Sequence, residues 1–156
     1  MKKNFILLFV ILLPSILWAR LIQTWTYQEM FDKADLVVIA TPITSKVISE
    51  KIILPDIFPD VHVVGVETTL SNLVMLKGDK KIKNIILHHY QLENSSELMF
   101  SGPFLISFDL TKRTRFILFL KKEADGRYAP VTGQTDPEST SVIRLNDSLV
   151  NDTPRP

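Results

Sequence analysis

RFILFLKKEADGRYAPV, residues Arg115 to Val131, holds the densest apolar run of the chain beyond its N-terminal segment. Its five unbroken apolar residues, Phe116 to Leu120, predict a strand that is buried on both faces. Asp125-Gly126 supplies the positive φ of a tight turn, so the residues that follow are expected to pair antiparallel with this strand. Pro130 has no N–H to donate to a ladder, which predicts that the second strand lies at a sheet edge. The stretch therefore predicts a central β-hairpin.

The N-terminal segment has the pattern of an export signal. Lys2 and Lys3 precede an apolar run from Phe5 to Trp18, and the small residue Ala19 ends it. This order of charge, apolar core and small residue predicts a signal peptide over residues 1–19. Leu17 stands where a small residue is more usual, so an uncleaved anchor is the alternative. We expect a bacterial protein exported to the periplasm or the cell exterior, with no further segment that spans a membrane.

Composition limits the partners and the source of stability. Loss of Lys2 and Lys3 takes the formal charge from +1 to −1, so nucleic acid is not an expected partner. The chain has no cysteine, and an exported domain without disulfides must rely on its apolar core. The length fits one domain over residues 20–145, followed by a polar tail over 146–156 that is expected to be disordered.

The rest of the chain alternates strand patterns with turns. Thr26 and Glu29 form a capping box that predicts a short helix. Four further strands are expected at Leu36 to Ala40, Val61 to Lys77, Ile82 to Leu92 and Val142 to Leu145. Past Pro42 the first pattern loosens over Ile43 to Ile48, as in a strand that leaves the core, and Lys51 to Asp60 is expected to be a loop or a wide hairpin connection. The longest run would exceed an ordinary strand, so a bend is expected at Gly65 or near Ser71-Asn72.

These elements predict a mainly β fold. One short N-terminal helix and five or six strands suit a small, closed or partly open antiparallel barrel that is OB-like.

Three segments carry a family resemblance. KADLVVIA (Lys33 to Ala40), VETTLSNLVMLKGD (Val66 to Asp79) and RFILFLKKEADGRYAPVTGQ (Arg115 to Gln134) resemble segments of small secreted bacterial proteins of unknown function. The resemblance implies the OB-like barrel of netrin modules and tissue inhibitors of metalloproteases. Those inhibitors grip a catalytic zinc through an N-terminal cysteine. This chain has no cysteine, so that activity does not carry over.

The histidines give only weak metal candidates. His88 and His89 are neighbours on a strand, so their side chains point to opposite faces and do not share an ion. His62 with His88 or His89, joined by Glu67 or Glu93, is the weak alternative. We expect no metal or other cofactor, and we expect one half-buried histidine with the others solvated. A G-x-S-x-G elbow and a glycine-rich phosphate loop are both missing from the sequence.

The segment from Leu98 to Phe108 has the strongest functional signal. Its apolar residues predict either a sixth strand that completes the core or an exposed lip over the barrel mouth. The lip would present a ligand or partner surface made of Leu98, Met99, Phe100, Phe104 and Phe108. We therefore expect an exported, non-enzymatic barrel domain that binds a partner protein or a small ligand in the cell envelope. The alternatives are a hydrolase with a site assembled across the barrel and a protease-inhibitor-like module.

Overall fold

The computed structural model describes residues 25–54, 61–94, 105–136 and 140–145. The expected signal peptide, the C-terminal tail and four residues of the expected lip, Leu98, Met99, Phe100 and Phe104, lie outside these ranges. No helical segment in these ranges has the length and hydrophobicity that a membrane span requires.

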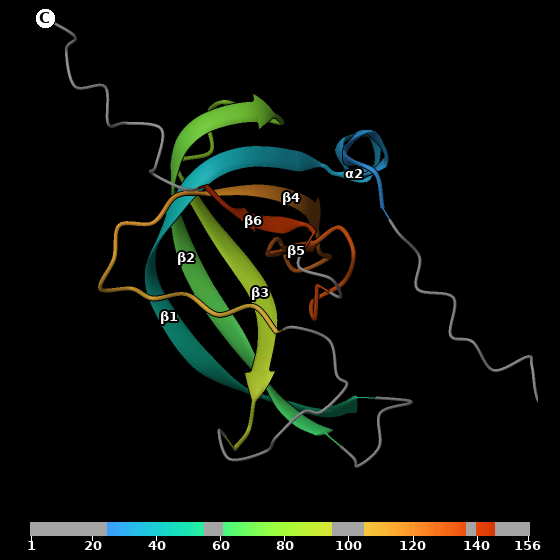
Figure 1. Cartoon of the computed structure of the whole chain (residues 1–156), viewed down its shortest axis with the longest axis vertical. Helices are drawn as coiled ribbons and strands as arrows, with labels where there is room; N and C mark the ends of the chain where they lie inside the picture. Colours follow the sequence, from blue (N-terminus) through green and yellow to red (C-terminus); the bar gives the residue numbers. More distant parts are fainter. Residues whose placement is uncertain (1–24, 55–60, 95–104, 137–139, 146–156) are drawn as a thin grey trace, which may run out of the picture.

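The described chain is mainly β, as the sequence predicts. The elements are α2 (Tyr27–Lys33), β1 (Leu36–Leu54), β2 (Val61–Lys77), β3 (Asn84–Leu92), β4 (Phe116–Lys122), β5 (Tyr128–Pro130) and β6 (Val142–Arg144). The strands follow the order β1-β2-β3-β5-β4-β6, and β1 also pairs with β4. Five strands therefore form a ring (Figure 1). This arrangement fits a partly open barrel of the OB-like type.

The ring closes through the hairpin that the sequence singles out. β4 and β5 pair antiparallel across the Asp125-Gly126 turn, as predicted, and Gly126 has a φ of 92°. The prediction that this second strand lies at an edge is wrong. β5 lies between β4 and β3, and it meets β3 in one parallel pair, Leu87 with Tyr128. Pro130 is tolerated because the contact with β3 is made at Tyr128, where the missing proline N–H is not needed.

β1 and β2 form a long, irregular hairpin. The segment Lys51 to Asp60 joins two antiparallel strands, as the hairpin alternative predicts, but its expected start is wrong, because β1 remains paired with β2 as far as Leu54. The predicted bend at Gly65 coincides with an irregularity, since three residues of β1, Ile48 to Glu50, stand opposite this single glycine. A Cβ on Gly65 would lie 2.8 Å from Cγ1 of Ile48. Glycine therefore lets the bulged strand approach closely.

The core fills the inside of the ring. It contains the buried residues Leu36, Val38, Ala40, Leu70, Ile85, Leu87, Phe116, Leu118, Leu120 and Tyr128. The alternation along each strand brings these side chains to one face. Each fully buried aliphatic side chain contributes on the order of 1.5–3 kcal/mol.

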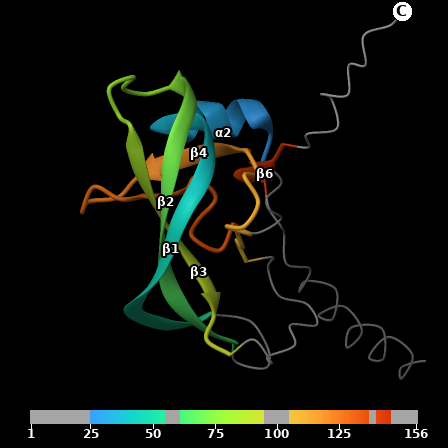
Figure 2. The ribbon, with the colours of Figure 1, turned by 90° about the vertical axis from the view of Figure 1, so that its left-hand side faces the viewer.

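α2 covers the outer face of β1 and β4. The capping box of Thr26 and Glu29 is present as predicted. Met30 is buried against Val37 and Phe119, which point away from the ring interior. Both views place α2 beside β4 (Figures 1 and 2). β4 is consequently buried on both faces, as its unbroken apolar run predicts.

Candidate functional site

β3 carries the two adjacent histidines to opposite faces of the sheet, as the sequence predicts. His89 shares a face with the core residues Ile85 and Leu87, whereas His88 lies on the outer face. Each side chain is only 3% exposed. The expectation that only one histidine is even half-buried is therefore wrong, because each histidine finds a polar partner that offsets its desolvation.

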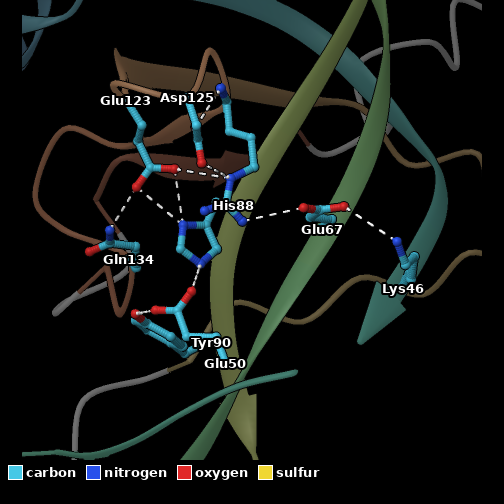
Figure 3. Close-up of polar contacts among 9 residues, drawn as sticks. Lys46, Glu50, Glu67, His88, Tyr90, Glu123, Asp125 and Gln134 are labelled. Atoms are coloured by element: carbon cyan, nitrogen blue, oxygen red, sulfur yellow. Dashed lines mark hydrogen bonds and ion pairs between the residues drawn. The ribbon is translucent and has the colours of Figure 1, made fainter. Parts of the chain in front are cut away.

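An outer cluster of polar side chains surrounds His88. Its members are Lys46, Glu50, Glu67, His88, Tyr90, Glu123, Asp125, Arg127 and Gln134 (Figure 3). Nδ1 of His88 lies 3.0 Å from Oε2 of Glu123. Nε2 lies 3.2 Å from Oε2 of Glu50, an ion-pair distance without the geometry of a hydrogen bond. The ring therefore stands between a carboxylate of β1 and a carboxylate that follows β4.

Arg127 balances the acidic residues of the outer cluster. Its Nε lies 2.7 Å from Oδ2 of Asp125 and 3.7 Å from Oε2 of Glu123, and its guanidinium also reaches Glu67 at 3.3 Å. Burial alone would lower the pKa of Arg127, but these three carboxylates together raise it above its ordinary value. Such a network is suited to tying neighbouring strands together.

The outer cluster has no activated hydroxyl within the described residues. Tyr90 donates its hydroxyl hydrogen to Glu50. Burial, followed by the hydrogen bond to Glu50, raises the pKa of Tyr90 above its usual value. The phenol therefore stays protonated and is a poor nucleophile. The two large cavities described below are lined by other residues.

The first of these cavities opens at the barrel mouth, and we call it the mouth cavity. It has a volume of about 640 Å³, and its lining residues are Ser45, Val66, His89, Gln91, Leu92, Glu93, Leu105, Ile106, Ser107, Phe108 and Leu110. The segment 105–115 crosses the face of the ring beside β1, β2 and β3 (Figure 1). It therefore supplies one wall of the cavity.

The described part of the expected lip is not a sixth strand. Residues 105–108 have no strand pairing, and Ile106 is buried. The Phe108 ring packs edge-on against Phe116 and His89, with centroids 5.0 and 5.5 Å away. Phe108 is half-buried, and these two ring contacts anchor it to the core. The end of the segment covers the barrel mouth without adding to the sheet.

A chain of polar side chains runs from the interior to the mouth cavity. Nε2 of His89 lies 2.8 Å from Oγ1 of Thr68, which lies 2.7 Å from Oγ of Ser45. Burial lowers the pKa of His89 to about 4, partly opposed by the Tyr90 backbone and assisted by His88. The ring is therefore neutral at neutral pH. Its Nδ1 makes no hydrogen bond.

The alternation of β3 was enough to place His89 beside Ile85 and Leu87. Sequence reasoning missed Ser45, Thr68 and the outer cluster, because these contacts join residues far apart in the chain. In the described ranges no group of three or more His, Asp or Glu side chains could hold a metal ion. The weak candidates His62 and His88 do not assemble such a site there. The main chain of His62 instead accepts a hydrogen bond from Glu93.

Fold and cavities define this chain as a cysteine-free, mainly β barrel domain with a covered mouth. Neither a protein-family model nor a curated protein matches its sequence.

Proposed function

We propose that this chain is an exported, non-enzymatic barrel domain that binds a small, largely apolar ligand in the cell envelope. The observation that carries the proposal is the mouth cavity. Its volume of about 640 Å³ falls in the range of small-molecule sites, about 300–1,000 Å³. Val66, Leu105 and Phe108 offer apolar walls, and a few polar groups offer orientation.

The polar groups favour an uncharged ligand. His89 is neutral at neutral pH, and Ser45 and Gln91 carry no charge. Glu93 is the one ionisable carboxylate of the lining, and it pairs with Lys51. An ionised ligand would lose its hydration in the cavity, and no unpaired charged side chain among the described lining residues would compensate for this cost.

The geometry around the histidines favours binding over catalysis. The hydroxyl partner of His89 belongs to Thr68, whose side chain is fully buried. His88 has carboxylates at both nitrogens and no hydroxyl partner among the described side chains. Neither histidine therefore contacts an accessible hydroxyl directly within the described chain, and the exposed Ser45 is joined to His89 only through Thr68. Export and the likeness to secreted netrin-type proteins are part of this proposal and rest on the sequence.

Titration with the neutral fluorophore N-phenyl-1-naphthylamine tests the proposal. Ser45→Phe fills the cavity from β1, whereas Ser49→Phe adds the same ring at an exposed position of the same strand. We expect saturable binding by the wild type and the Ser49→Phe variant, and at least tenfold weaker binding by Ser45→Phe. Circular dichroism checks that both variants are folded. Equal affinities in the two folded variants, or no saturable binding by the wild type, would reject the proposal.

A further inference from the structure

A second cavity, which we call the arginine groove, lies against residues 110–115, the C-terminal half of the segment that crosses the ring. It has a volume of about 780 Å³ and is lined by Thr41, Pro42, Ile43, Ser71, Leu73, Leu110, Arg113 and Arg115. Leu110 lines the mouth cavity as well. The lining has two cations and no acidic residue, which distinguishes it chemically from the mouth cavity.

Two β-bulges supply the apolar wall of the groove. In the pairing of β1 with β2, Pro42 faces Leu70 and Thr44 faces Thr69, so Ile43 is left unpaired. Leu73 is likewise left unpaired between Asn72 and Val74. Bulges commonly re-aim a side chain. Both large residues are about half exposed, at 52% and 51%, and both line the groove.

The extended segment before β4 supplies the charged wall. Side chains alternate along an extended chain, and the buried Thr114 stands between Arg113 and Arg115. Both arginines therefore point away from the core, and both line the groove. Within the described residues neither arginine has an ion-pair or hydrogen-bond partner through its side chain. Two unpaired guanidinium groups beside exposed apolar side chains complement a molecule with an anionic head and an apolar body.

We propose that the arginine groove binds a single-chain amphiphile with an anionic head, a carboxylate or a phosphate monoester. The guanidinium groups of Arg113 and Arg115 hold the head, and Ile43, Leu73 and Leu110 contact the chain. This site is separate from the mouth cavity, and its occupation does not depend on the function proposed above.

Isothermal titration with eight-carbon probes below their micelle concentrations tests the inference. We expect octanoate or octyl phosphate to bind, and octan-1-ol and octylammonium to bind at least tenfold more weakly. The comparison of the two anions identifies the preferred head. The double variant Arg113→Gln/Arg115→Gln should lose at least tenfold in affinity. The matched control Lys121→Gln/Lys122→Gln removes the same charge from two exposed positions and should bind as the wild type does.

Three results would overturn the inference: no binding of either anion, equal affinity for octan-1-ol, or the same loss in both double variants. A further arm separates the two sites. Ser45→Phe should leave binding of the anion unchanged, because Ser45 lines the mouth cavity and not the groove. Loss of anion binding in a folded Ser45→Phe variant would place the anion in the mouth cavity and contradict the inference.

Discussion

The buried histidine of the barrel interior shows how one residue couples stability to pH. His89 donates to or accepts from Thr68, and its ring is enclosed by the core and by Phe108. The enclosure disfavours the imidazolium, so burial lowers the pKa to about 4. In the unfolded chain the same ring has an ordinary pKa near 6.5.

The sign of the pH dependence follows from these values. Between pH 6.5 and pH 4 the unfolded chain binds a proton at His89 that the folded chain does not, so the free energy of unfolding falls as pH falls. Between pH 7.5 and pH 5 we expect the wild type to lose about 2 kcal/mol more than His89→Gln. His88 and Glu93, the titratable neighbours of this ring and its cavity, are unchanged in the variant.

Urea unfolding at the two pH values measures this difference. His89→Gln keeps a polar group that reaches Thr68, so a similar stability of both proteins at pH 7.5 is the expected control. An equal loss in wild type and variant on acidification would contradict the buried, neutral state of His89.

The sequence correctly predicts that the side chains of His88 and His89 point to opposite faces of the sheet, but it does not predict that both are buried. Adjacent residues of a strand point to opposite faces, so the separation of His88 from His89 followed from spacing alone. Their burial did not, because it depends on Thr68, Glu50 and Glu123, which only the folded chain brings near.

Among the elements, the bulged hairpin of β1 and β2 does most to shape the barrel. Three of its four irregularities lie opposite Gly65 and at Ile43 and Leu73. The first lets Ile48 approach the glycine, and the other two aim apolar side chains into the arginine groove. The hairpin curves along the ring in both views (Figures 1 and 2).

Gly65→Ala should therefore destabilise the fold. A Cβ would lie 2.8 and 2.9 Å from Cγ1 and Cδ1 of Ile48, well inside contact distance. Overpacking of this kind costs about 1–3 kcal/mol. Chemical denaturation measures the change in the free energy of unfolding.

A double-mutant cycle tests the cause. Ile48→Ala removes both clashing atoms, so Gly65→Ala should cost at least about 1 kcal/mol less in that background than in the wild type. The same cost in both backgrounds would show that the approach of Ile48 does not explain the need for glycine.

Most elements were predictable, since burial patterns and turn residues are local. Val61–Lys77 has the predicted bounds, and the capping box starts α2 as expected. The errors came from tertiary pairing. β1 runs on past Lys51 because β2 continues to pair with it, and β5 is internal because β3 approaches at Tyr128. The local sequence does not indicate that β2 pairs with the end of β1 or that β3 pairs with β5.

The described strands form a ring whose weakest pairing is the one between β3 and β5. β3 and β5 share one residue pair. β5 and β6 lie one after the other along the edge of β4 that does not pair with β1. The segment 105–115 crosses the face of the ring and separates two cavities of different chemistry. The mouth cavity is lined mainly by apolar and uncharged polar groups, with Glu93 as its one carboxylate, whereas the arginine groove carries two cations.

The predicted signal peptide over residues 1–19 implies that the protein is exported to the cell envelope. Expression of the full chain in a bacterium, followed by N-terminal sequencing of the protein, tests it. We expect release into the periplasm or medium with Arg20 as the first residue, because Ala19 ends the signal pattern. A cell-associated protein that retains Met1 would instead support the uncleaved anchor.

The proposed function requires that the mouth cavity is a ligand site. Amide chemical-shift mapping during titration with N-phenyl-1-naphthylamine locates the bound ligand and so checks this requirement. We expect saturable shifts concentrated at Ser45, Val66, Gln91 and residues 105–107, with the outer-face residues Glu67 and His88 little affected. Saturable shifts confined to the outer cluster, or none at the mouth, would contradict it.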